Sequence, residues 1–302
     1  MTARPDGGDV AVLVHVHYPE IWRDMAPLLA RRMTVPFRLL VTTEHPEAAI
    51  VRPHSRHMQS FRVLPVQNRG RDILPFLRAL AEEAPFDIGL KLHTKKSPQR
   101  EDGTQWRNAV LDSLLPRRGM SAIVRRMRAE PRAGFVTPAG FALSVRPWVL
   151  QNGGGMARVM AALDHELVDA DLEDTFFAAG SMFWFRRDAL AALATPAVME
   201  RFEPEEAQLD GTAAHAAERL FPVEARRQGF LSLPMEALLR SRPGMGQAEL
   251  LSLARRFADV PSTFFPAPYV AALAPAPLSP LKAAYARLPL PLRRTIRALR
   301  GG

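Results

Sequence analysis

The sequence contains no cysteine. Disulfide bonds, cysteine-ligated zinc, iron–sulfur clusters and thiol catalysis are therefore excluded. Long hydrophobic runs are missing too, because no stretch reaches the roughly 18 to 20 apolar residues that span a bilayer. The first nine residues are polar and include no apolar stretch of signal-peptide form. We therefore expect a cytoplasmic protein, made without translocation, with residues 1–9 as a flexible N-terminus.

Acidic residues are absent from the last 43 residues of the chain, 260–302. Six lysines and arginines lie there, so this segment holds two-thirds of the formal net charge of +9. The rest of the chain is only mildly basic, and a high pI alone does not indicate a nucleic-acid partner. Residues 241–302 are rich in proline, which prevents a long helix. We expect a basic extension that either contacts anionic lipid at the inner face of the membrane or is a disordered, solvated tail.

Apolar runs alternate with helical patterns over most of the remaining sequence. Val10–Val16 is an almost unbroken β-branched and aliphatic run, typical of a strand buried on both faces of a parallel sheet. Strands separated by helices predict right-handed βαβ units. We expect one α/β domain over 10–240, with a mostly parallel sheet flanked by helices. Further strands are predicted over 37–42, 61–66, 87–92, 134–138 and 175–185, helices over 22–32, 72–83, 106–115, 121–130, 187–194 and 211–220, and a loop at 153–155.

The segment Asn68-Arg69-Gly70-Arg71-Asp72 joins a predicted strand to a predicted helix. Such junctions hold ligands in α/β proteins. Gly70 lets a backbone come close, Arg69 and Arg71 can pair with phosphate, and Asp72 can accept from ribose hydroxyls or a base N–H. These properties suit a nucleotide-linked ligand. In the alternative interpretation, Asp72 is only a carboxylate at a helix N-terminus and the arginines are solvated.

Polar residues also follow the other predicted strands at the same edge of the sheet. His15 and His17 lie two residues apart and so face the same side of their strand. They are either close to a donor molecule or hydrogen-bonded histidines of the core. The residues expected to bind the donor are His15, His17, Asn68, Gly70, Arg71, Asp72, His93, Lys95 and Lys96.

Five segments in collinear order carry a recognisable pattern, and they are 14–22, 68–77, 90–97, 180–186 and 205–220. Over Val10 to Phe221 the sequence resembles the rhamnan synthesis F family, glycosyltransferase-like proteins of bacterial surface polysaccharide assembly. The resemblance implies a fold similar to the GT-A glycosyltransferases. It also implies a nucleotide-sugar donor, with dTDP-rhamnose or another deoxyhexose as the expected sugar, and a glycan or lipid-linked glycan acceptor.

Glycosyl transfer requires compensation for the charge of a diphosphate leaving group. Many GT-A enzymes carry an Asp-x-Asp metal site after the fourth strand, where this chain has His93-Thr94-Lys95. Lys95, Lys96 and Arg71 can stabilise the diphosphate instead. We therefore expect transfer without a divalent metal or other cofactor. The literal Asp169-Ala170-Asp171 is expected to be an exposed helix end with a structural role.

An inverting transferase also needs a base for the acceptor hydroxyl. The resemblance points to Glu205, and Asp210 competes with it, although Asp210 can instead cap the following helix. Trp184 can form a stacking wall for a sugar or be part of the core. His215, Glu218 and Arg219 lie on one predicted helix and can instead form a structural polar cluster. The residues expected to contact the acceptor are Gly180, Ser181, Trp184, His215 and Arg219.

A noncatalytic component of a polysaccharide assembly, which binds a nucleotide sugar or a glycan, is the alternative function. Asp72 is needed for donor binding in both cases. Glu205 is needed only if the chain transfers a sugar.

Overall fold

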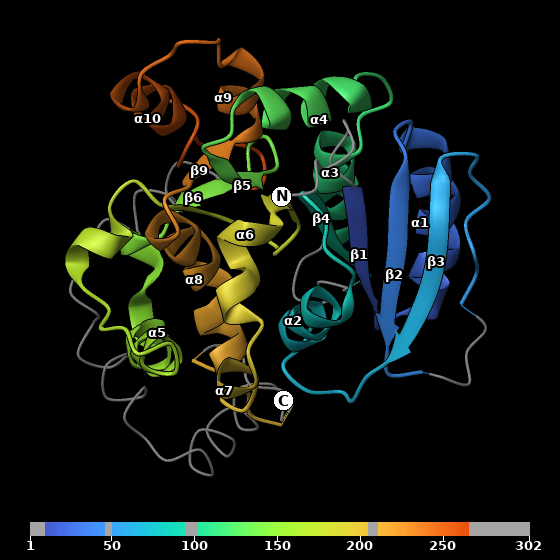
Figure 1. The fold of residues 1–302 in the computed structure, drawn as a ribbon, viewed down its shortest axis with the longest axis horizontal. Helices are drawn as coiled ribbons and strands as arrows, with labels where there is room; N and C mark the ends of the chain where they lie inside the picture. The colour runs from blue at the N-terminus through green and yellow to red at the C-terminus, as the bar shows by residue number, and fades with distance from the viewer. Residues whose placement is uncertain (1–9, 46–49, 95–101, 205–210, 266–302) are drawn as a thin grey trace, which may run out of the picture. The chain divides into compact units, whose positions relative to one another are not determined.

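The computed structural model describes residues 10–45, 50–94, 102–204 and 211–265. The chain divides into two compact units, 1–260 and 261–302. In the first unit, seven strands form one sheet in the order β3-β2-β1-β4-β8-β5-β9 (Figure 1). β8 is antiparallel to both of its neighbours, and the other pairs are parallel. The strands are β1 Val10–Val16, β2 Phe37–Thr43, β3 Met58–Pro65, β4 Ile88–His93, β5 Ala133–Thr137, β8 Phe183–Arg186 and β9 Leu231–Pro234.

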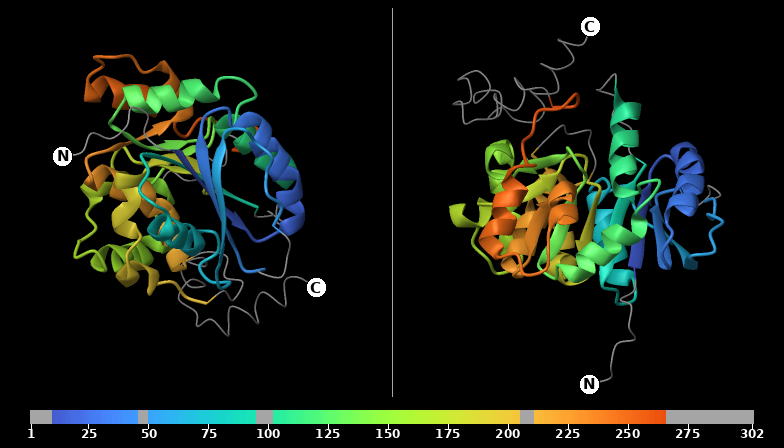
Figure 2. Two further views of the ribbon diagram at one scale, coloured as in Figure 1. Left: turned by 45° about the vertical axis from the view of Figure 1, so that its right-hand side comes forward. Right: turned by 90° about the horizontal axis from the view of Figure 1, so that it is seen from above.

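Helices cover both faces of this sheet, with α1 (Pro19–Arg32) and α2 (Ile73–Glu82) on opposite faces (Figures 1 and 2). α3 (Gly103–Leu114) lies on the α1 side, where Arg32 donates to the Leu115 carbonyl at 2.9 Å. α8 (Ala213–Arg227) packs on α2, with the rings of Phe76 and Phe221 5.5 Å apart. The expected α/β architecture, a mostly parallel sheet flanked by helices, is confirmed.

An aromatic cluster forms the core between β8, α2 and α8. Phe183 and Phe185 of β8 pack edge-to-face against Phe76 of α2, at 5.8 and 5.3 Å. Phe221 of α8 lies 5.2 Å from Phe183. All four side chains are buried. Each pair adds about 0.5–1.5 kcal/mol beyond the burial of its area, so the cluster holds the three elements together.

Two local predictions were wrong. The glycine triplet at 153–155 begins helix α5 (Gly153–Ala161) instead of forming a loop. The predicted strand over 175–185 is divided into β7 (Phe176–Ala178) and β8, because Gly180 and Ser181 have φ values of 89° and 56° and interrupt the extended backbone. β7 pairs instead with β6 (Ala142–Ser144) in a separate two-stranded sheet.

The first unit also extends beyond the predicted boundary at residue 240. Helix α10 (Gln247–Arg255) packs on α9 (Met235–Arg240) and on β9, and it buries Leu250 and Ala254. In the described residues no helix is long and apolar enough to cross a membrane. The remaining elements are the helices α4 Met120–Ala129, α6 Arg187–Leu190 and α7 Pro196–Met199, and the 3-10 helices Arg146–Trp148, Leu150–Asn152, Asp169–Leu172 and Ala191–Leu193.

Candidate functional site

The strand order changes direction at β1, since the chain passes from β1 to β2 on one side and later returns to β4 on the other. Ligands of open α/β sheets bind at such a switch point, beyond the carboxyl ends of the strands. His15, near the end of β1, is in register with Thr42 of β2 and with His93 of β4. The sheet therefore brings together three polar residues that are far apart in sequence.

A buried ion pair lies beside this switch point. Lys91 Nζ is 2.6 Å from Asp72 Oδ2, and the two side chains are 1% and 7% exposed. The same ammonium group donates to the Ser181 carbonyl at 2.6 Å and to the Ser181 hydroxyl at 3.0 Å. It also lies over the rings of Phe76 and Phe183, at 5.5 and 5.6 Å. Lys91 therefore holds Asp72 in one orientation and compensates its charge.

His93 connects the end of β4 to the turn that precedes β8. Its Nε2 is 2.7 Å from the Gly180 carbonyl, so Nε2 carries the proton and donates it. The same nitrogen lies 3.8 Å from Asp72 Oδ2. This bond fixes the position of the Gly180–Ser181 turn relative to the sheet.

Two left-handed turns face the same pocket. Gly70 and Arg71 have φ values of 66° and 55°, and Gly180 and Ser181 have values of 89° and 56°. A Cβ on Gly70 would lie 2.6 Å from Leu74 Cβ, so only glycine fits there. For Arg71 and Ser181 a positive φ costs of the order of 1–3 kcal/mol each, and such strain concentrates at functional sites.

The pocket between these turns brings predicted donor and acceptor residues together. It has a volume of about 40 Å³. That space holds one substituent, whereas pockets for whole ligands measure about 300–1,000 Å³. The pocket is lined by Arg71, Asp72, Ile73, Gly180, Ser181, Ala214, His215 and Glu218.

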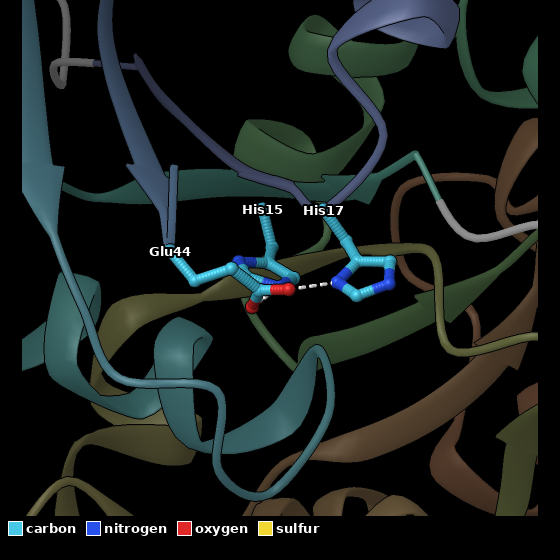
Figure 3. A group of neighbouring side chains, drawn as sticks. All are labelled: His15, His17 and Glu44. Atoms are coloured by element: carbon cyan, nitrogen blue, oxygen red, sulfur yellow. Dashed lines mark ion pairs between the residues drawn. The ribbon is translucent and has the colours of Figure 1, made fainter. Parts of the chain in front are cut away.

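A second polar cluster, which we call the histidine–glutamate cluster, consists of His15, His17 and Glu44 (Figure 3). His17 Nδ1 pairs with Glu44 Oε1, and His15 Nε2 lies 3.8 Å from Glu44 Oε2. His45 approaches the same carboxylate, also at 3.8 Å. His15 Nδ1 is 3.1 Å from the Thr42 hydroxyl.

Burial has opposite effects on the two kinds of group in this cluster. Burial lowers the pKa of His15 from 6.5 to about 4, although Asp72 and Glu44 act in the other direction. The imidazole of His15 is therefore neutral near pH 7. Burial alone raises the pKa of Glu44, but the hydrogen bond with His17 and the charges of the nearby imidazoles outweigh it, so the pKa is below its ordinary value.

The family model for rhamnan synthesis protein F matches residues 2–229. The chain belongs to the rhamnan synthesis F family. Two curated relatives, both named uncharacterized protein WxcX and both from Xanthomonas campestris pv. campestris, are 35% identical to it over 238 residues. The matched region is 76% of this chain and 33% of each relative. This family member thus spans about a third of the length of the curated relatives that it matches.

Among solved structures, a CMP:2-keto-3-deoxy-manno-octonic acid synthetase complexed with CTP aligns with 75% of this family member and with 89% of its own chain. The TM-score is 0.35 and the sequence identity 11%. A similarity of this size supports no conclusion about ligands.

Two predicted contacts of this family member are corrected, that of Trp184 by its burial and that of Arg69 by its hydrogen bonds. Trp184 is fully buried and its indole donates to the Leu114 carbonyl at 3.0 Å, so it cannot stack on a sugar. Arg69 donates to the Phe202 carbonyl at 2.7 Å and also reaches the carbonyl of Glu200. Its guanidinium group ties the loop to the segment after α7 and is not directed to a phosphate.

Arg219 has a structural role, which was the alternative to contact with the acceptor. Its guanidinium donates to the carbonyls of Trp148 and His215, both at 2.8 Å, and only 7% of the residue is exposed. Thr212, and not Asp210, is the N-cap of α8, with its hydroxyl 2.8 Å from His215 Nδ1. Asn68 is exposed beside the Gly70 turn.

The Asp-x-Asp sequence forms most of a separate short 3-10 helix, Asp169–Leu172, and is not the end of a longer helix. Asp169 is 84% exposed and pairs with Arg146 at 2.7 Å, and Asp171 lies 3.5 Å from Arg227. Both carboxylates therefore have arginine partners. The predicted residues Lys95, Lys96, Glu205 and Asp210 lie outside the described residues.

Two residues of the site were missed by the sequence reasoning, Lys91 and Glu44. Lys91 stands between Leu90 and Leu92 in an apolar strand, and a lysine buried in such a run is rare unless it is paired. That position could have identified it. Glu44 follows β2 without a distinctive pattern, and its relation to His15 and His17 appears only when the strands pair.

Proposed function

We propose that this chain is a glycosyltransferase that moves a sugar, rhamnose or another deoxyhexose, from a nucleotide-sugar donor to a growing surface polysaccharide or lipopolysaccharide. Membership of the rhamnan synthesis F family supports a role in polysaccharide synthesis. The observation that carries the proposal is the pocket at the sheet edge, where Arg71 and Asp72 face His215 and Glu218 between two strained turns. The proposal concerns this chain and not the remaining length of its larger relatives.

The chemistry of the pocket suits the groups of a nucleotide sugar. Arg71 offers a planar fork of donors to a phosphate oxygen. Asp72, held by Lys91, accepts hydrogen bonds from hydroxyl groups without having to move. A pocket for one substituent fits a single hydroxyl or phosphate group of the ligand, so the rest of the donor lies along the edge of the sheet. Glu205 as base, with Asp210 as its competitor, and Lys95 and Lys96 as partners of the diphosphate stay predictions.

Calorimetric titration of the full chain with UDP-, GDP- and dTDP-sugars tests donor binding. Arg71→Gln should weaken the affinity at least tenfold, which is about 1.4 kcal/mol. The matched control is Arg78→Gln, on α2 and outside the pocket. Equal losses in both variants, or no saturable binding of any nucleotide sugar, would argue against the proposal.

A transfer assay with the donor so identified separates the enzyme from a noncatalytic binding component. Glu205→Gln should leave donor affinity unchanged and abolish transfer. Donor binding by the wild-type chain without any transfer to a glycan or lipid-linked glycan would favour the noncatalytic component.

We also propose that the basic extension 241–302 contacts anionic lipid, because its C-terminal part carries lysines and arginines without acidic residues. Cosedimentation with phosphatidylglycerol vesicles should depend on salt and should fail with phosphatidylcholine vesicles.

A further inference from the structure

We propose that His15, His17 and Glu44 bind a divalent transition-metal ion. One ligand atom from each residue, two imidazole nitrogens and a carboxylate oxygen, lies within 4.8 Å of the other two. Metal–ligand distances of about 2.0–2.2 Å place ligand atoms roughly 3–4 Å apart around one ion. Small rotations of the Glu44 and His17 side chains therefore suffice to close the site.

The backbone of the cluster is fixed by the sheet. His15 belongs to β1 and is paired with Thr42 of β2, and Glu44 follows the last residue of β2 (Figure 3). Because adjacent parallel strands hold the backbones of His15 and Glu44, only side-chain torsions remain to be set. A preformed site of this kind loses little conformational entropy on binding an ion.

The hydrogen bond of His15 prepares its second nitrogen for a metal. The Thr42 hydroxyl lies 3.1 Å from His15 Nδ1 and accepts from it in the tautomer that carries the proton on Nδ1. With the proton on Nδ1, the lone pair of Nε2 faces Glu44 at 3.8 Å. Metal-bound histidines commonly donate their other N–H in this way, which fixes the tautomer and the ring orientation.

Glu44 has no lysine or arginine partner in the part of the chain that the structure describes. Its side chain is 9% exposed, and among the described residues its ion-pair partners are His15, His17 and His45, with no lysine or arginine. A metal ion would supply a permanent positive charge to this half-buried carboxylate. Two imidazoles and one carboxylate select zinc, iron(II) and related ions over Mg²⁺ and Ca²⁺, which prefer oxygen ligands.

Three protein ligands leave coordination positions open, and phosphate oxygens have the chemistry to fill them. Binding of phosphate oxygens to the ion rests on the proposed function, whereas binding of the ion itself does not. The inference also departs from the expectation of metal-independent transfer, which was argued from the lack of an Asp-x-Asp after the fourth strand. Here the ligands come instead from the ends of two neighbouring strands, β1 and β2.

The test is calorimetric titration of the EDTA-stripped full chain with Zn²⁺, with Co²⁺ absorption as a report on coordination. We expect one ion per chain with a Kd in the micromolar range or below. His17→Ala and Glu44→Gln should each weaken binding at least tenfold. His54→Ala is the matched control, because His54 is exposed before β3 and outside the cluster, and it should bind as the wild type does.

His17 is the more informative histidine, since its side chain is 36% exposed and that of His15 only 5%. Circular dichroism confirms that each variant is folded. Absence of Zn²⁺ binding by the wild type, wild-type affinity in His17→Ala and Glu44→Gln, or an equal loss in His54→Ala would each overturn the inference. Nucleotide-sugar binding in EDTA without any Zn²⁺ binding would overturn this inference alone and leave the proposed function standing.

Discussion

A buried carboxylate, Asp72, and a half-buried one, Glu44, lie at the same edge of the sheet, and they differ in what surrounds them. Lys91 Nζ lies 2.6 Å from the Asp72 carboxylate, and the same ammonium group donates to the Ser181 carbonyl. Among the residues that the structure describes, the ion-pair partners of Glu44 are all histidines. The chain therefore compensates one carboxylate with its own lysine and surrounds the other with histidines. The first arrangement stabilises the fold, while the second keeps a charged group available to a ligand.

Lys91→Met gives the largest expected effect, because it removes the cation of the closed pair and leaves Asp72 buried with its charge uncompensated. A loss of about 3–5 kcal/mol in the free energy of unfolding is expected. Guanidinium unfolding followed by circular dichroism measures it. Asp72→Asn combined with Lys91→Met should recover part of the loss. A change below about 1 kcal/mol in the free energy of unfolding of the single variant would show that the Lys91–Asp72 pair is not needed to hold the site together.

Glu224 is a further carboxylate, fully buried, and extends the comparison to a group without a lysine or histidine ion-pair partner among the described residues. Its Oε1 accepts from Gln228 at 2.7 Å, its Oε2 has no hydrogen-bond partner among the described residues, and burial raises its pKa although Gln228 and Arg227 oppose the shift. The folded state thus keeps a proton that the unfolded chain has already released. Stability from this residue is complete below the ordinary glutamate pKa of 4.5 and is lost as the pH rises through the raised folded pKa.

Glu224→Gln should therefore stabilise the chain by about 1 kcal/mol at pH 8 and by less at pH 5. Thermal unfolding at the two pH values checks this difference. An equal change in the melting temperature at both would contradict the assignment of the effect to ionisation.

Glu44→Gln gives the smallest expected effect when metal ions are chelated, a loss of about 1 kcal/mol or less at pH 7. Because the pKa of Glu44 is lowered in the folded state, its contribution is present above 4.5 and is lost as the pH falls through the folded pKa. Urea unfolding in EDTA at pH 7 and at pH 3 measures it. A loss as large as that of Lys91→Met would remove the distinction between the two carboxylates.

Patterns that depend on a few consecutive residues were predicted well. The strand over Val10–Val16 was found with both ends correct, because an unbroken aliphatic run has few alternatives in a parallel sheet. The glycines at 153–155 were wrongly assigned to a loop, and packing explains the difference. A Cβ on Gly155 would lie 3.1 Å from Ala216 Cβ, so Gly155 allows α5 to approach α8 closely.

The candidate site itself was predicted in part. Arg71, Asp72, Gly180, Ser181 and His215 were named in advance and line one pocket, although their roles stay predictions. The contacts that position them were not predicted. Lys91 bonds to Ser181 across 90 positions, and no local pattern records a contact at that separation.

The antiparallel strand β8 has a consequence for synthesis. β1 to β4 can pair as soon as the first hundred or so residues have emerged, but the free edge of β4 has to wait for β8, which is made much later. During that interval the exposed edge is a potential template for aggregation, and an inward-facing charge is one of the devices that protects such edges. Lys91 stands on that edge strand, so a residue that later pairs with Asp72 can first protect the edge of the nascent chain.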